Sequence, residues 1–140
     1  CHMSRLLGEQ SAPLELLRRL GARTLEATDA DQCCGFGGTF AMTEPPVSTA
    51  MADSKIASLQ PARQAGAIAL VSADLGCLLH LGGRLSRRGE PWPVLHIAEA
   101  VDLAERGRLT PAALTAEQQT YGAEQPRGAD ERSGAGGERR

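Results

Sequence analysis

The sequence predicts an α/β domain in which a small parallel sheet is flanked by helices. Residues 12–20 and 46–59 carry apolar side chains at the spacing of an amphipathic helix. Residues 67–72 form a continuous apolar run, and residues 93–97 form a second, shorter one. Such runs beside helices are typical of strands buried in a parallel sheet. Because helical and strand patterns alternate along the chain, the pattern indicates helices layered over a sheet.

The first third of the chain predicts one helix and one strand before a glycine-rich loop. Pro13 stands in the first turn of the helix at 12–20, and Gly21 follows its last apolar residue. Residues 23–28 predict a short strand. The loop at 31–40 then reads DQCCGFGGTF, in which three of the four residues after the cysteine pair are glycine.

A second helix is predicted over 46–59, with Pro46 at a tolerated first-turn position. Residues 61–66 are expected to extend or restart this helix. The expected apolar face of the helix consists of Val47, Ala50, Met51, Ser54 and Leu59.

The second half of the chain continues the alternation of strand and helix. Residues 77–89 predict a helix that carries Cys77 at its N-terminus. After the strand at 93–97, residues 98–107 predict another helix, which Gly107 closes.

The composition changes near the C-terminus. The last twenty residues are rich in Gly, Arg and Glu and almost free of apolar side chains, so they cannot bury enough surface to offset the entropy of ordering. The predicted organisation is therefore a cysteine-rich domain over residues 1–107, a short helical extension over 108–120 and a disordered tail over 121–140.

The composition also argues against several classes of function. Apolar residues make up 41% of the chain and aromatic residues only 3%, so the core is expected to consist of Leu, Ala, Val and Ile. The net charge is −2, Lys55 is the only lysine, and no basic stripe indicates nucleic-acid binding. No apolar run approaches the roughly 20 residues of a membrane span. The chain opens on Cys1 rather than methionine, so we expect it to be part of a longer protein.

Four cysteines carry the strongest chemical signal. Cys1, Cys33, Cys34 and Cys77 have the spacing C-x31-CC-x42-C. Disulfides fit poorly, because no secretory signal is visible and a bridge between adjacent cysteines strains the peptide between them. Inert burial accounts for Cys77 or Cys1 alone, but it explains poorly a cysteine pair in a glycine-rich loop. The remaining interpretation is thiolate ligation of a metal centre.

Metal ligation gives the cysteine and glycine pattern a single cause. Glycines let the backbone approach a ligand closely and direct N–H groups at it. The predicted helix N-terminus at Cys77 is a place where the helix dipole is expected to lower the thiol pKa. An adjacent cysteine pair suits an iron–sulfur cluster better than zinc, because neighbouring thiolates can reach different metals of one cluster. Spacing alone leaves zinc open.

Three stretches resemble the cysteine-rich CCG domain family. They are CCGFGGTFAMTEPPVSTAMADSKIASL from Cys33, GAIALVSADLGCLLHLGGRLSRRG from Gly66 and VLHIAEAV from Val94, and the opening CHM resembles the element that carries the family's first cysteine. The resemblance covers the chain from its first residue to about Ala104. Similar domains occur in lactate-utilization protein A, the glycolate oxidase iron-sulfur subunit and the cysteine-rich subunit of heterodisulfide reductase. Members usually carry two such domains, and this chain resembles the second, without the residues before its first cysteine.

The resemblance implies that Cys1, Cys33, Cys34 and Cys77 bind an iron–sulfur cluster of the [4Fe–4S] type. It implies an electron-transfer component of a complex that oxidises L-lactate or a glycolate-like 2-hydroxy acid, with the other subunits of that complex as partners. Such a component is expected to be cytoplasmic and to reach the inner membrane only through its partners. The alternatives are a thiol–disulfide redox subunit like that of heterodisulfide reductase and a structural zinc module without a redox role.

One departure concerns His80, which stands where the heterodisulfide-reductase branch has its last cysteine and so favours the lactate and glycolate branch. His80 follows Cys77 by three residues and lies on the same helical face, so it is a candidate metal ligand or hydrogen-bond donor to sulfur. The competing interpretation is a partly buried helix residue with a satisfied ring.

His96 is expected to be structural, at a strand–helix junction. Phe36 and Phe40 flank the glycines and are expected to shield the site from water.

Overall fold

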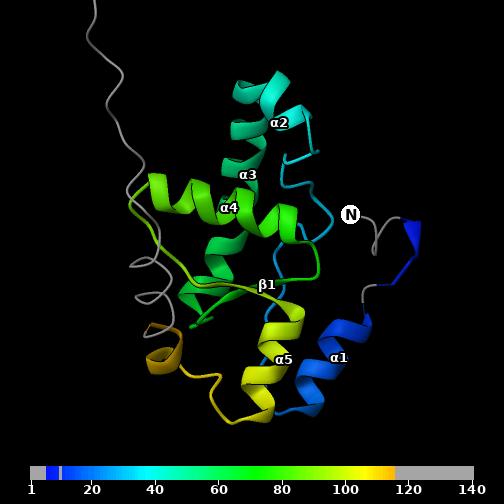
Figure 1. The fold of residues 1–140 in the computed structure, drawn as a ribbon, viewed down its shortest axis with the longest axis vertical. Coiled ribbons are helices and arrows are strands. Elements are labelled where there is room, and N and C mark those ends of the chain that lie inside the picture. Colours follow the sequence, from blue (N-terminus) through cyan, green and yellow to red (C-terminus); the bar gives the residue numbers. More distant parts are fainter. Residues whose placement is uncertain (1–5, 10, 116–140) are drawn as a thin grey trace, which may run out of the picture.

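A computed structural model describes residues 6–9 and 11–115 and confirms the predicted α/β class. Residues 111–115 form a further helical turn. The predicted disordered tail at 121–140 and the end of the predicted extension lie outside the described residues. The elements, drawn in Figure 1, are α1 (Ser11–Arg19), α2 (Phe40–Thr43), α3 (Pro45–Gln64), β1 (Leu70–Ser72), α4 (Leu75–Arg87), β2 (Val94–His96) and α5 (Ile97–Glu105).

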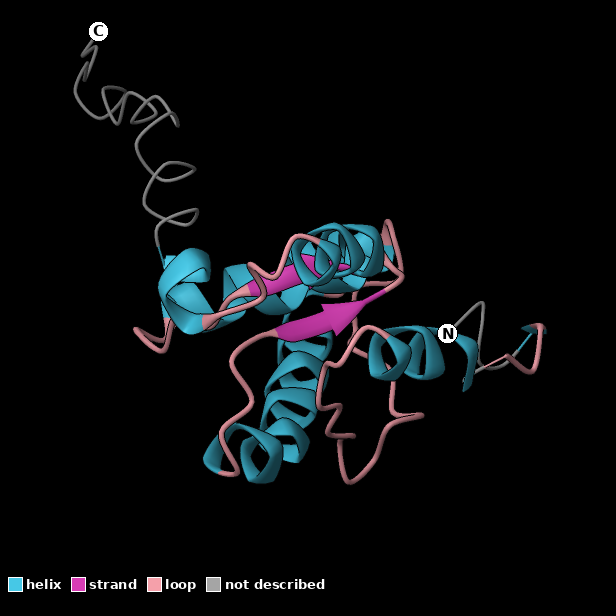
Figure 2. Ribbon diagram, turned by 90° about the horizontal axis from the view of Figure 1, so that it is seen from below, coloured by secondary structure: helices cyan, strands magenta, loops and turns pink. Residues whose placement is uncertain are grey.

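The two strands of the described chain pair in parallel, as the continuous apolar runs predict. Leu70 lies opposite Val94 and Ser72 lies opposite His96, and the strands run side by side in Figure 2. Both strands are only three residues long, and every residue of β1 is half-buried. The expectation that this strand is buried on both faces is therefore only partly met, because one edge of β1 borders a cavity instead of a neighbouring strand.

The strand predicted at 23–28 is wrong. These residues are assigned no strand, and their one backbone anchor at the far end is the N–H of Thr28, which donates to the carbonyl of Ser58 in α3 at 3.3 Å. A strand requires a hydrogen-bonded neighbour, and this segment faces β1 across a cavity instead of pairing with it. Local sequence could predict an extended conformation there but not the missing neighbour.

The helix predictions are confirmed, with two corrections. α3 continues through Pro61 to Gln64, so the second predicted segment extends the helix. Its buried face differs from the expected one, because Val47 is 50% exposed and Ala50 is exposed, whereas Ser48 is buried. The face that points inward consists of Ser48, Ala52, Ile56, Leu59 and Ala62.

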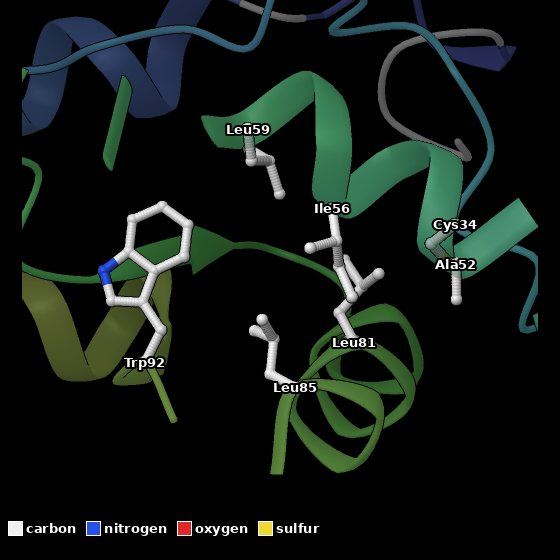
Figure 3. Packing of buried hydrophobic residues seen from close by; sticks show 7 residues of the cluster. All are labelled: Cys34, Ala52, Ile56, Leu59, Leu81, Leu85 and Trp92. Atoms are coloured by element: carbon white, nitrogen blue, oxygen red, sulfur yellow. The ribbon is translucent and has the colours of Figure 1, made fainter. Parts of the chain in front are cut away.

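The buried side chains form two clusters on opposite faces of the sheet. One lies between α3 and α4 and is closed by Trp92, whose indole N–H donates to the carbonyl of Ala67 at 3.2 Å (Figure 3). The other lies between α1 and α5. Leu70 packs against the first cluster and Val71 against the second, as alternate residues of a strand should. α3 and α4 therefore cover one face, while α1 and α5 lie together on the other.

None of the helices in the described residues has the length and apolar content that a membrane crossing needs.

Candidate metal centre

Two of the four predicted ligands meet at one point. Cys34 is buried in the glycine-rich loop, and Cys77 is half-buried in the first turn of α4. Their sulfur atoms lie 2.7 Å apart although 43 positions separate them in the sequence, and no disulfide joins them. The first turn of α4 is fixed by Asp74, whose carboxylate caps the helix by accepting a hydrogen bond from the N–H of Cys77 at 2.9 Å.

The structure describes only one of the other two predicted ligands. Cys33 is half-buried, and its sulfur accepts a hydrogen bond from the backbone N–H of Gly35 at 3.4 Å. Cys1 lies outside the described residues. Within residues 6–9 and 11–115, no group of three or more His, Cys, Asp or Glu side chains has the arrangement that holds a metal ion. The structure therefore brings two predicted ligands together and leaves the full set of four untested.

The contact between the two thiols shifts their pKa values in opposite directions. The hydrogen bond between them lowers the pKa of Cys34 to about 6, against the opposing effect of burial. The pKa of Cys77 is raised, first by that shared hydrogen bond, then by burial and by the negative charges of Cys34 and Asp74. The lowering of the pKa that the helix dipole was expected to produce at Cys77 is therefore overridden, and the lowered pKa belongs to Cys34.

Gly35 lets the cysteine loop rest directly on α3. Its φ is +86°, and a Cβ atom added there would lie 2.5 Å from the carbonyl oxygen of Ser48 and 2.8 Å from the Cβ of Met51. A second close approach occurs in α4, where a Cβ on Gly76 would lie 2.5 Å from the ring of Phe36. The sequence predicted glycines that approach a ligand, but in this structure both of these glycines admit another part of the chain.

Ser48 and His80 join the loop to both helices, and sequence reasoning missed this link. The buried hydroxyl of Ser48 donates to the carbonyl of Gly35 at 2.8 Å. The Nε2 atom of His80 lies 3.2 Å from the same hydroxyl oxygen, which has no second proton to give. Nε2 must therefore carry the ring proton and donate it, which leaves Nδ1 as the free acceptor. The sequence did not place Ser48 on the expected apolar face of α3, so it gave no signal for the link.

Comparison with known families accounts for this arrangement of cysteines and glycines. A family model described as CCG, cysteine-rich domain, matches residues 1–82, which is more than half of the chain. The chain belongs to the cysteine-rich CCG domain family.

Two curated relatives of this CCG domain share the name lactate utilization protein A. Lactate utilization protein A of Geobacillus kaustophilus is 48% identical over 103 residues, which are 73% of this chain and 42% of the relative. The protein of the same name from Halalkalibacterium halodurans is 42% identical over 109 residues, which are 77% of this chain and 43% of the relative. The chain thus spans about two fifths of the length of these relatives. No solved structure matches it.

Aromatic rings and a lysine complete the surroundings of the cysteines in this CCG domain. Phe36 is half-buried, lies against Gly76 and has its ring centroid 6.1 Å from that of His80. Phe40 is also half-buried and packs on Gly37. Both rings thus serve the packing of the loop, and their shielding of a bound group stays a prediction.

Lys55 holds the start of the loop. Its ammonium donates hydrogen bonds to the carbonyls of Asp29 at 2.7 Å and Ala30 at 3.1 Å. Burial lowers the pKa of Lys55, while the nearby carboxylates and the cysteine pair oppose that effect. Composition singled out this lysine as the only one, but nothing in the sequence placed it beside the cysteines.

His96 has the structural role that the sequence predicts. Its Nδ1 accepts a hydrogen bond from the N–H of Ala98 at 3.3 Å, and the backbone N–H of His96 donates to the carboxylate of Glu99 at 2.7 Å. These reciprocal bonds form a capping box at the start of α5. The remaining ring nitrogen, Nε2, then donates to the carbonyl of Ala73 at 3.2 Å.

The thiols of Cys34 and Cys77 are donors of the kind that bind a metal group. The distance between their sulfur atoms must increase when a metal binds. Two thiolates that bind one tetrahedral metal at about 2.3 Å have their sulfur atoms about 3.8 Å apart. The Cys34 and Cys77 sulfurs lie 2.7 Å apart, which is closer than two such bound thiolates and longer than the roughly 2.05 Å of a disulfide. Deprotonation and rotation of both side chains would open the pair, and the lowered pKa of Cys34 favours its thiolate.

Proposed function

We propose that this CCG domain is an iron–sulfur electron-transfer component of a system that oxidises L-lactate or a related 2-hydroxy acid. Cys1, Cys33, Cys34 and Cys77 are the proposed ligands. One observation carries the proposal: thiols from a glycine-rich loop and a helix N-terminus converge, with one of them ready to ionise near pH 6. Four thiolates are the number that a [4Fe–4S] cluster needs.

When bound, the cluster would accept and release single electrons. The chain's own residues hold and position it. Gly35 directs its backbone N–H at the sulfur of Cys33, and hydrogen bonds to sulfur favour the thiolate and raise a cluster's potential. Ser48 and His80 fix the carbonyl of Gly35 and thereby the loop that carries both adjacent cysteines. Phe36 covers the junction of this loop with α4 and limits access of water.

His80 is assigned to this positioning network rather than to the ligand set. Its Nε2 proton is committed to Ser48, so only Nδ1 is free to accept a hydrogen bond or bind a metal. This arrangement favours the interpretation of a half-buried helix histidine, with one of its two ring nitrogens satisfied.

The relatives support the proposed substrate class and partners. Those relatives are named for lactate utilization, and more than half of their length lies outside the match. We assign the oxidation of the 2-hydroxy acid to partner subunits in the cytoplasm, with which this domain exchanges electrons.

Anaerobic reconstitution tests the proposal. The purified chain is incubated with ferrous iron and sulfide, desalted, and analysed for iron, sulfide, visible absorption and the electron paramagnetic resonance of its reduced form. Four iron and four sulfide per chain with a reducible signal are expected. Uptake of zinc in preference to iron, with no visible absorption, would make the site structural and refute the electron-transfer role.

A thiol moved elsewhere in the chain provides the matched control. Cys34→Ser is expected to abolish cluster formation, and Cys34→Ser combined with Ser86→Cys keeps the number of thiols constant. Ser86 is exposed near the end of α4, far along the helix from its N-terminus. Recovery of the cluster in the double variant would mean that thiol count, and not the site, determines iron binding.

A further inference from the structure

A cavity of about 450 Å³ separates two extended stretches of the chain. Residues 22–27 line one side of it, and residues 67–74, which include β1, line the other. The first stretch is the one in which the sequence predicts a strand. Packed protein interiors leave few voids larger than a water molecule, so a cavity of this size between two extended segments indicates a missing occupant.

Helices line the cavity on both faces. α1 and α5 contribute Leu14, Leu17 and Ala100, while α3 contributes Leu59 and Ala62 from the opposite side. An apolar slot with extended backbone along both edges and helices on both faces is the environment of a central strand in a parallel sheet.

Backbone hydrogen bonding points to the same occupant. The N–H of Leu70 donates to the carbonyl of Pro93 at 2.7 Å, so Leu70 faces β2. Alternate residues of a parallel strand direct their backbone groups to opposite sides, and those of Val71 therefore face the cavity. Across it, the N–H groups of residues 23–27 donate no hydrogen bond to any other described residue. Two backbone edges without partners among the described residues thus face each other.

The placement of the helices fixes where the occupant belongs in the chain. Crossovers between parallel strands are right-handed, so a helix changes face when the chain reverses its direction across the sheet. A chain that runs from a strand in the cavity through α1 to 23–28 crosses the sheet in one direction. From 23–28 through α3 to β1, and from β1 through α4 to β2, the chain crosses the sheet in the opposite direction. This path puts α1 on one face and α3 with α4 on the other, as observed.

We propose that the cavity seats a β-strand, parallel to β1, supplied by the residues immediately upstream of Cys1 in a longer chain. The strand order becomes 23–28, new strand, β1, β2, and the direction of travel reverses at the new strand. Doubly wound sheets bind ligands at the carboxyl ends of the strands beside such a reversal. The cavity reaches Cys34 and Cys77 at that end of β1, so a strand ending there delivers Cys1 to them.

The seating of the strand is independent of any cluster, whereas the delivery of Cys1 as a ligand rests on the proposed function. Hydrogen exchange of the metal-free protein tests the seating alone. A chain that begins about 12 residues upstream of Cys1 in the natural reading frame has room for a strand of about six residues and its approach. In it, exchange at the alternate amides of 23–27 that face the cavity and at Val71 should slow by at least an order of magnitude relative to the 140-residue chain, with amides of α4 as the internal reference.

Proline provides the matched control, because it cannot donate to a strand ladder. The same extended chain with two alternate upstream residues replaced by proline should lose the protection. If that variant fails to fold, the 12-residue upstream peptide is added in trans to the 140-residue chain, where saturable protection of the same amides is expected. The proposal is overturned if extension leaves exchange unchanged. It is also overturned if the 140-residue chain already shows full protection at all concentrations, because a small bound molecule then fills the cavity. Protection of that chain only on dimerisation overturns it as well, because a second copy then fills the cavity.

Reconstitution separates the two proposals. In the extended chain, Cys1→Ser should leave the exchange protection intact and reduce iron uptake. Protection without any cluster in the unsubstituted extended chain would refute the proposed function and leave the strand standing. A cluster with unprotected amides would refute the strand and leave the function standing.

Discussion

Replacing Gly35 with alanine tests the contact between the cysteine loop and α3. The residue has φ +86°, and its missing Cβ is the reason that the loop can approach the carbonyl of Ser48. Left-handed backbone costs a non-glycine residue about 1–2 kcal/mol, and overpacking of a close contact costs about 1–3 kcal/mol. Gly35→Ala should therefore lower the free energy of unfolding by about 2–5 kcal/mol.

Gly38 offers a matched control in the same loop. Its φ is +61°, but a Cβ added there meets nothing within 4 Å. Gly38→Ala should therefore cost only the backbone strain of about 1–2 kcal/mol. The assay is urea or thermal unfolding of the metal-free protein followed by circular dichroism, where each kcal/mol shifts the midpoint by about 4–8 °C for a domain near this size. Equal losses in the two variants would refute the argument that Gly35 is required by its contact with α3.

Three further predictions use the same unfolding assay. Ser48→Ala removes a buried hydroxyl that serves two partners and should cost about 1–3 kcal/mol, whereas Ser86→Ala on the exposed end of α4 should change stability by less than about 0.5 kcal/mol; similar values for both would contradict the network. The lowered pKa of Cys34 stabilises the metal-free fold above the ordinary thiol value of 9.0, and this stabilisation should be lost as pH falls through about 6. The raised pKa of Cys77 should make stability fall again above pH 9. A free energy of unfolding that stays flat from pH 6 to 10 in the unsubstituted protein would count against the hydrogen bond between the two thiols. So would a pH profile that Cys34→Ser leaves unchanged. His96→Ala should cost about 1 kcal/mol through loss of the α5 cap, and His96→Asn should retain most of that stability; equal losses would show that capping is not its role.

The helices were predictable because their signals are local. Pro13, Pro46, Gly21 and Gly107 mark ends that the structure reproduces within a few residues. The strand predicted at 23–28 failed because pairing depends on a neighbour that local sequence does not specify. The buried face of α3 was misassigned for a related reason.

That misassignment concerned Ser48. The expected apolar face did not include this serine, but its hydroxyl is buried and is satisfied by Gly35 and His80, which belong to other segments. A buried polar group is tolerated where partners exist, and partners from distant segments are visible only in the folded chain.

The sequence by itself determined the α/β class, the family and the residue types of the site, because helical periodicity, apolar runs and the spacing of cysteines and glycines are properties of the chain in order. Only the tertiary structure decided that Cys34 and Cys77 come into contact, that this contact lowers the pKa of Cys34, and that β1 has an open edge beside a cavity. The physical reason is that the pKa of a thiol and the pairing of a strand depend on neighbours within a few ångströms. Here those neighbours come from segments up to 43 positions apart.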